Sequence, residues 1–251
     1  MRYPWHSEKL VIIMPAKKVI FVIVEGPSDE DALGVIFQRF FDKNTVRVKV
    51  IHGDITTEKL VNSSNILNHV VEIVKQSLKE YKLHKTDLLR VIHLVDTDGA
   101  YIPDSAVVFD EKADKPIYST MQIKTTHPER LIQRNLQKKA NLTKLHSAKN
   151  IWGDIPYSVF YLSCNLEHAL YNELNLTDED KEKKALQFAK KYKNDIPSFV
   201  DFVRSSDFAV INGYLPSWSF IKQDLHSLER HTNIGLCFGE EILPAKDEMA
   251  E

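Results

Sequence analysis

The chain has 251 residues, of which 43% are hydrophobic and 27% are charged, and its formal net charge is -2 at pH 7. This length allows one large domain, or a core domain with a smaller one, and the charge excludes an overall basic field that would attract nucleic acid. Two cysteines outside any CxxC or Cys/His cluster, and no apolar run near the ~18 residues of a membrane span, predict a cytoplasmic protein with reduced thiols and no membrane partner.

Strands and helices are predicted to alternate through the first part of the chain. Residues 1–17 lack a signal-peptide pattern and are expected to form an N-terminal extension. The nearly continuous apolar run at 18–24 is typical of a strand buried on both faces of a parallel sheet. Ser28 is expected to cap the helix that follows, with Asp31 three residues later. Further strands are predicted at 46–51 and 88–95, and a helix at 60–81. This order predicts an α/β fold with a mostly parallel sheet flanked by helices.

The second part of the chain has a less regular pattern. The predicted elements are two short strands at 106–110 and 116–120 that could form a hairpin, a helix at 128–147, a sheet strand at 157–162, and helices at 165–174, 178–192, 198–205 and 217–230. The end of the chain is expected to be frayed. We therefore expect a core domain at 18–175, with an insertion at about 100–150 that carries a basic helix. A helical C-terminal region is expected at 176–245.

Acidic side chains stand where two of the predicted strands end. Glu25 follows the strand at 18–24, and Asp96 and Asp98 follow the strand at 88–95. Ligands of open α/β sheets bind at the carboxyl ends of the strands, so the three carboxylates converge if these strands are neighbours. Such oxygen ligands suit Mg²⁺ or Mn²⁺ rather than zinc. Simpler explanations remain for each motif alone, because Asp-x-Asp-Gly is common in turns and acidic residues favour helix starts.

Two stretches of this pattern together resemble the TOPRIM domain, the catalytic fold of topoisomerases, primases and several nucleases. They are IVEGPSDEDAL and HLVDTDG, and the Glu-Gly-Pro-Ser-Asp-Glu form is most similar to the TOPRIM half of OLD-family nucleases. The resemblance covers 18–99. It implies a Rossmann-like sheet in which Glu25, Asp96 and Asp98 are catalytic. It also implies that Asp29 joins these three as a metal ligand.

A later stretch fits this resemblance more loosely. In YLSCNLEHAL, Glu167 follows the predicted strand at 157–162, where OLD-like and RloB-like proteins carry an acidic residue, so Glu167 is a further candidate metal ligand. The alternative is a helix-start glutamate capped by Asn165. No GxxxxGK[ST] motif occurs, which implies a stand-alone TOPRIM protein with a possible separate ATPase or other defence-system partner. OLD-type sites also use a downstream lysine, for which the candidates are Lys190, Lys191, Lys193 and Lys222.

A local basic segment lies between the predicted strands at 88–95 and 157–162. From residue 124 to residue 149 it contains seven basic residues and one acidic residue, a local charge of about +6. The candidates for nucleic-acid binding are Lys124, Arg130, Arg134, Lys138 and Lys139. Three of them are spaced four apart and would line one helix face, which could neutralise backbone phosphates. The alternative is an ordinary solvated helix face.

The main functional hypothesis is a divalent-metal-dependent nuclease. Two cations about 4 Å apart would clamp the scissile phosphate, activating water and stabilising the leaving oxygen. The resemblance suggests a role in defence against phage or other foreign nucleic acid. The alternatives are an RNA-processing TOPRIM ribonuclease and a non-catalytic module that binds nucleic acid or a partner. The sequence leaves open whether DNA or RNA is the substrate, and it leaves the oligomeric state open.

Overall fold

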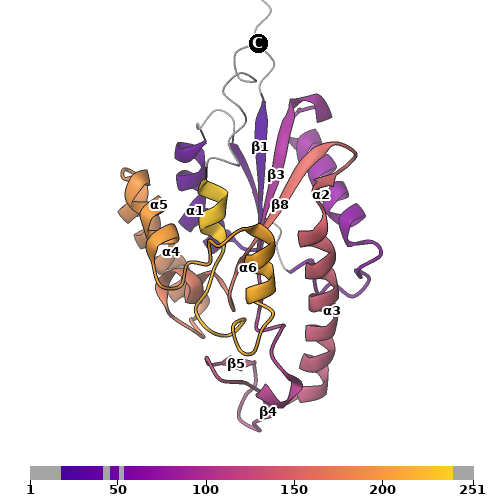
Figure 1. Cartoon of the computed structure of the whole chain (residues 1–251), viewed down its shortest axis with the longest axis vertical. Coiled ribbons are helices and arrows are strands. Elements are labelled where there is room, and N and C mark those ends of the chain that lie inside the picture. Colours follow the sequence, from indigo (N-terminus) through magenta and orange to yellow (C-terminus); the bar gives the residue numbers. More distant parts are fainter. Residues whose placement is uncertain (1–17, 42–45, 51–53, 240–251) are drawn as a thin grey trace, which may run out of the picture.

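The computed structural model describes residues 18–41, 46–50 and 54–239, and the expected N-terminal extension and frayed end lie outside these ranges. A five-stranded sheet lies at the centre, in the order β2-β1-β3-β8-β7 (Figure 1). Its strands are β1 (Val19–Val24), β2 (Val46–Val50), β3 (Leu88–Asp96), β7 (Asn150–Ile151) and β8 (Ile155–Leu162). β7 alone among these five is antiparallel to its neighbour. The predicted α/β class with a parallel-rich sheet is therefore confirmed, and β1 and β3 are direct neighbours.

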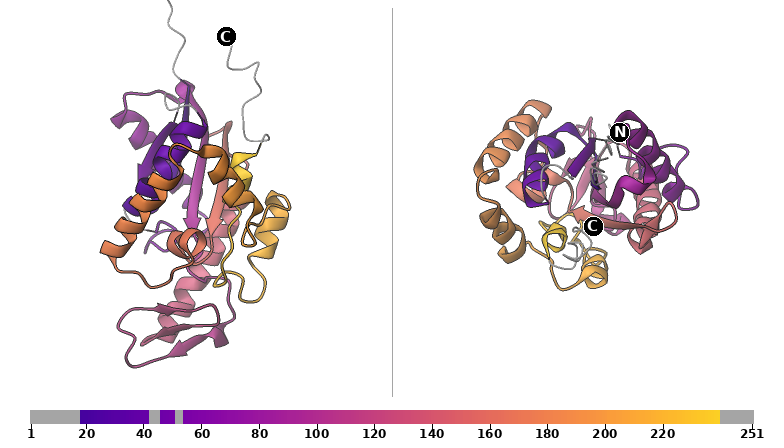
Figure 2. Two further views of the ribbon diagram at one scale, coloured as in Figure 1. Left: turned by 90° about the vertical axis from the view of Figure 1, so that its left-hand side faces the viewer. Right: turned by 90° about the horizontal axis from the view of Figure 1, so that it is seen from above.

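Helices cover both faces of this sheet, as the view from above in Figure 2 shows. All six residues of β1 are buried, and alternate side chains face opposite layers. One layer contains α1 (Pro27–Phe40), and the other contains α2 (Ile66–Glu80) and α3 (Pro128–Ser147). A strand that is covered on both faces needs apolar residues at every position, which explains the continuous apolar run.

The helices that follow β8 pack on this same core. α4 (Asp178–Tyr192) and α5 (Ile196–Ser205) contribute buried residues to the cluster that contains β1 and α1. α6 (Tyr214–Phe220) places Trp218 in the cluster on the opposite face. The described part of the predicted C-terminal region is thus continuous with the central sheet. The short helical turns are η1 (Lys85–Asp87), η2 (Asp104–Ala106), η3 (Glu167–Tyr171) and η4 (Ile234–Phe238).

A second, three-stranded sheet projects from the main body, at the bottom of the left view in Figure 2. Its strands are β4 (Val107–Phe109), β5 (Ile117–Tyr118) and β6 (Ile123–Thr125). The predicted hairpin between the first two is wrong, because both pair with β6 instead, β4 in parallel and β5 antiparallel. β6 has only three residues, too few to show the alternation that identifies a strand.

Four predicted helices have different bounds in the structure, although α5 differs only in beginning two residues earlier than expected. α2 begins six residues later than expected, because Asn62 and Asn65 hydrogen-bond each other in a preceding turn. The helix predicted at 165–174 is reduced to η3, which ends at Asn172 in a left-handed conformation. The helix predicted at 217–230 ends with α6, and the Ser227 carbonyl beyond it accepts hydrogen bonds from Thr97 and Cys164.

The cap of α1 also differs from the prediction. The N-cap is Gly26 rather than Ser28, and Pro27 is the first helical residue. The Asp29 carboxylate, not that of Asp31, accepts a hydrogen bond from the Gly26 amide at 2.9 Å. This bond helps to hold the Asp29 side chain beside the end of β1.

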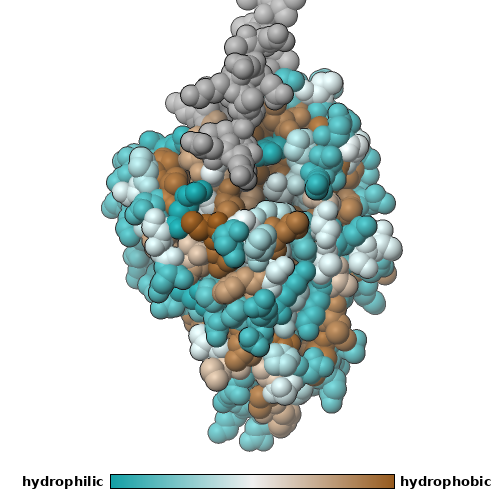
Figure 3. All heavy atoms as spheres, viewed as in Figure 1, coloured by the Kyte–Doolittle hydropathy of each residue, from teal (hydrophilic) through white to brown (hydrophobic). Residues whose placement is uncertain are grey.

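None of the helices within the described residues has the length and apolar composition of a membrane span. On the face seen in Figure 3, hydrophobic residues form small groups among hydrophilic ones, as is usual on protein surfaces.

The packing of α4 on the central core can be tested with two substitutions on that helix. Phe188 is 7% exposed and stacks among Tyr171, Tyr192 and Phe199, whereas Leu186 is 53% exposed. Phe188→Ala should lower the free energy of unfolding by about 3–5 kcal/mol, and Leu186→Ala by less than about 0.5 kcal/mol. Urea denaturation measures both. Equal effects, or a separate transition for the C-terminal helices, would contradict a shared core.

Candidate functional site

The carboxyl ends of β1 and β3 bring the predicted acidic residues together. Glu25 directly follows β1, Asp96 is the last residue of β3, and the two strands pair in parallel. The backbone amide of Asp96 donates a hydrogen bond to Glu25 Oε1 at 3.2 Å. β8 lies on the other side of β3, and Glu167 follows it in η3. The expected convergence at one edge of the sheet is therefore present.

The turn that carries Asp98 is held in place from behind. Asp98 and Gly99 both have positive φ angles, of 46° and 65°. The Asp98 amide donates to the Cys164 carbonyl at 2.8 Å, and Thr97 Oγ1 donates to the Ser227 carbonyl at 3.1 Å. A Cβ atom at position 99 would lie 2.5 Å from Leu228 Cδ2, so glycine is needed both for its conformation and for space.

Burial and like charge raise the pKa values of three of these carboxyl groups. Burial raises the pKa of Asp96 well above its usual value, and the charges of Glu25 and Asp29 add to the shift. Burial also raises the pKa of Glu25, against the opposing charge of Lys138. Burial raises the pKa of Asp29 to about 6, where the hydrogen bond from Gly26 opposes the shift. The ionised forms of these groups are thus unfavourable in the protein without a bound cation.

Glu167 lies at the far side of this acidic group. It is 3% exposed, and its charge contributes to the raised pKa values of Asp29 and Asp96. Lys181, near the start of α4, lies 3.7 Å from Glu167 Oε2. The predicted placement of Glu167 beside the other acidic residues agrees with these contacts.

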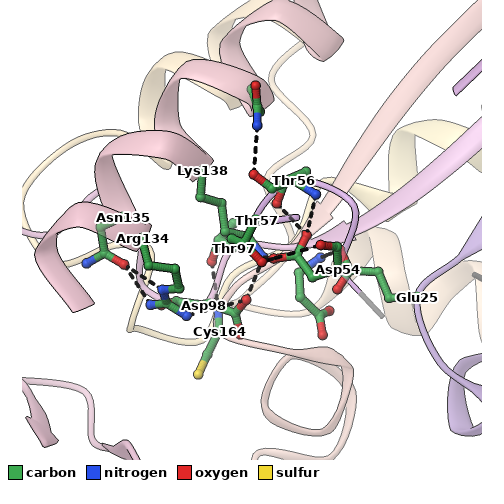
Figure 4. A network of polar contacts seen from close by, with 12 residues as sticks. Glu25, Asp54, Thr56, Thr57, Thr97, Asp98, Arg134, Asn135, Lys138 and Cys164 are labelled. Atoms are coloured by element: carbon green, nitrogen blue, oxygen red, sulfur yellow. Dashed lines mark hydrogen bonds and ion pairs between the residues drawn. The ribbon is translucent and has the colours of Figure 1, made fainter. Parts of the chain in front are cut away.

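Lys138 occupies a position that the sequence did not predict. Its side chain has no exposed surface, and Nζ lies 2.6 Å from Asp54 Oδ2 and 2.5 Å from Asp98 Oδ2 (Figure 4). Burial alone would lower the pKa of Lys138, but the charges of Asp98, Glu25 and Asp54 hold it well above its usual value. The assignment of Lys138 to a nucleic-acid-binding face is therefore corrected, because this lysine points into the acidic group.

Asp54 is the acidic residue that sequence reasoning missed. Its carboxylate accepts hydrogen bonds from the Thr56 amide at 2.8 Å, from the Thr56 hydroxyl, and from Thr57 Oγ1 at 3.0 Å. Burial alone would raise its pKa, but Lys138 and these hydrogen bonds outweigh burial and lower it. The DITT sequence has the pattern of an ordinary Asx turn. Only the contact with Lys138, 84 residues away, connects Asp54 to the site.

Arg134, one helical turn before Lys138, also contacts Asp98. Its Nη2 donates to the Asp98 carbonyl at 2.9 Å, and Nη1 lies 3.7 Å from Asp98 Oδ2 (Figure 4). The same guanidinium donates to the Tyr118 hydroxyl on β5 at 3.2 Å. Arg134 therefore connects the second sheet to the acidic site.

The remaining basic candidates lie further from the acidic group. Arg130 is exposed on α3, Lys139 is half-buried, and Lys124 on β6 forms an ion pair with Asp110 at 3.4 Å. Lys190 and Lys191 lie in the last turn of α4, about 15 Å along that helix from Lys181. The candidate Lys193 follows them, and Lys222 instead contacts His146, with 2.9 Å between Nζ and Nε2.

A cavity of about 500 Å³ lies beside the site, between the second sheet and the start of α4. Its lining includes Tyr118, which contacts Arg134, and Lys181, which contacts Glu167. Another cavity, of about 650 Å³, is lined by Arg90, Arg204 and other residues. Neither lining contains a predicted site residue, but the smaller cavity adjoins the site through the contacts of Tyr118 with Arg134 and of Lys181 with Glu167.

Within the described residues, no group of three or more His, Cys, Asp or Glu side chains is already arranged to hold a metal ion. Three of the carboxylates already have another partner: Glu25 the Asp96 amide, Asp29 the Gly26 amide, and Asp98 the Lys138 ammonium. The donors are of the right chemistry for a hard cation, and binding would require their side chains to reorient.

Comparisons of the chain with protein-family models, curated proteins and solved structures found no match. The geometry of the acidic site is therefore the basis for any functional assignment.

The raised pKa of Asp29 predicts that the stability of the folded protein depends on pH. The folded protein keeps this proton up to about pH 6, whereas the unfolded chain releases it near the ordinary aspartate pKa of 3.8, so stability falls as the pH rises through this interval. Asp29→Asn should therefore raise the free energy of unfolding near pH 7 by about 1–3 kcal/mol, and change it little near pH 4. Denaturation with EDTA at both pH values measures the difference. Asp31→Asn, on the exposed side of the same turn, is the control, and an equal gain at both pH values would contradict the assignment.

Proposed function

We propose that this protein is a divalent-metal-dependent nuclease with a TOPRIM-type site. The observation that carries the proposal is the group formed by Glu25, Asp29, Asp96 and Glu167 at the carboxyl ends of neighbouring parallel strands, where burial and neighbouring charges raise the pKa values of Glu25, Asp29 and Asp96. Such a group is costly without a cation. Its position matches the resemblance of IVEGPSDEDAL and HLVDTDG to TOPRIM nucleases.

The carboxylate oxygens would hold Mg²⁺ or Mn²⁺, since hard cations prefer oxygen ligands. When bound, the cation supplies an activated water and neutralises charge on the scissile phosphate. The chain supplies the position of the substrate. In this proposal a nucleic-acid strand approaches through the cavity lined by Lys181 and Tyr118, which contact Glu167 and Arg134, and the exposed Arg130 contacts its phosphates. The resemblance to OLD-family nucleases suggests that the substrate is foreign nucleic acid.

A non-catalytic module is the second candidate, and one observation favours it. Lys138 and Arg134 already neutralise Asp98, so part of the acidic group is satisfied without any metal. A protein that only binds nucleic acid could keep this network for stability. Asp96 and Asp29 argue against this alternative, because burial and the charges of neighbouring carboxylates raise their pKa values, which a purely structural network would gain by avoiding.

Cleavage assays test the proposal directly. The full-length protein should cut plasmid DNA, linear DNA or structured RNA with Mg²⁺ or Mn²⁺ and not with EDTA. Glu25→Gln and Asp96→Asn should each lower the rate at least about a hundredfold, or about 2.7 kcal/mol in the barrier, because each removes a charged ligand. Comparing DNA and RNA of one sequence distinguishes a DNA nuclease from an RNA-processing enzyme.

The matched control is Asp31→Asn, which removes an exposed acidic residue two positions after Asp29 in α1 and should leave cleavage unchanged. Cleavage that survives in Asp96→Asn would show that the activity comes from another site or from a contaminant. Tight binding of nucleic acid without cleavage under any metal condition would support the non-catalytic module.

A further inference from the structure

The acidic group divides into two halves that differ in charge balance. In one half, Asp54 and Asp98 contact Lys138, and Asp98 also contacts Arg134. In the other half, Asp29, Asp96 and Glu167 lie together, and the nearest cation in the described structure is the partly exposed Lys181. Glu25 lies between the halves, since it feels the charges of Lys138 and of Asp29. We name these the paired half and the open half.

The ammonium of Lys138 is placed as a bridging cation would be. It lies within 2.6 Å of one oxygen from each of two carboxylates that come from different loops. The side chain is fully buried in the structure, and Thr56 and Thr57 hold the Asp54 carboxylate in place for it. A divalent ion entering the paired half would meet this positive charge at short range, which opposes its binding.

We propose that Lys138 permanently takes the place of one of the two cations of a two-metal site, so that this protein binds a single divalent ion, in the open half. The proposal rests on the proposed function and specifies its site. Asp96, Asp29, Glu167 and Glu25 hold the ion. Asp98, the second member of the Asp-x-Asp pair, instead holds Lys138 and Arg134 and so fixes the position of α3.

The decisive measurement is the number of Mn²⁺ ions bound by the full-length protein. Calorimetric titration, checked by the electron paramagnetic resonance of free Mn²⁺, should give one ion per chain. Asp96→Asn should weaken binding of this ion by more than about a hundredfold, whereas Asp98→Asn should weaken it less, within the roughly 10–100-fold range of an indirect effect. The two substitutions are matched, because both remove one charge from the same turn and an amide oxygen can still accept from Lys138.

Lys138→Met adds a second test, because methionine keeps the length of the side chain and removes its charge. The variant should bind two Mn²⁺ ions and should gain more thermal stability from Mn²⁺ than the wild type does. If this variant does not fold, the wild-type stoichiometry and the matched aspartate pair still decide the question.

Each outcome has a distinct meaning. Two ions in the wild type, or a single ion that is lost in Asp98→Asn and kept in Asp96→Asn, would overturn the one-ion site. No bound ion would overturn both this inference and the metal-dependent function. One bound ion without cleavage of any nucleic acid would remove the nuclease function and leave the one-ion site standing.

Discussion

The structure depends on how like charges are held together at one edge of the sheet. Parallel strands bring Glu25 and Asp96 to the same place, and buried carboxylates are unfavourable unless a cation or hydrogen-bond donors compensate them. Lys138 supplies one such cation. Its position follows from the packing of α3, because Leu142 and Leu145 anchor that helix on the sheet while the turns before them carry Lys138 and Arg134 toward Asp98. The core and the charge network therefore form together.

The C-terminal part of the chain supports the site from behind. The Ser227 carbonyl accepts hydrogen bonds from Thr97 and Cys164, and Leu228 packs against Gly99. These contacts join the turn after β3, the end of β8 and the segment after α6. These contacts give a structural role to the C-terminal residues, to which the sequence alone assigned none. They fix the Asp-x-Asp turn in a conformation that its own residues, with two consecutive positive φ angles, would not favour strongly.

The sequence predicts those strands and helices that depend on a local pattern of residues. The continuous apolar runs identified β1 and β3, and helical spacing gave the bounds of α3 without error. The features that the sequence did not predict depend on contacts between residues that are far apart in the chain. The four-residue spacing that ends at Lys138 shows that these side chains share a helix face, but only distant carboxylates decide that Arg134 and Lys138 turn inward while Arg130 stays exposed. Asp54 was missed for the same reason, because its local sequence indicates only an Asx turn and its contact with Lys138 is remote in the chain. The helix expected at 217–230 failed because tertiary contacts capture the Ser227 carbonyl.

The two halves of the acidic group together argue for function rather than for stability. The paired half has what a structural network needs, since Asp54 receives threonine hydroxyls and a buried ammonium. The open half does not, because burial and neighbouring carboxylates keep the pKa values of Asp29 and Asp96 raised. A protein selected for stability alone would gain by neutral residues at these positions. Local rules are broken in this way mainly at functional sites, where a ligand supplies the missing interaction. The charge left uncompensated in the open half is therefore the feature that a bound cation would complete.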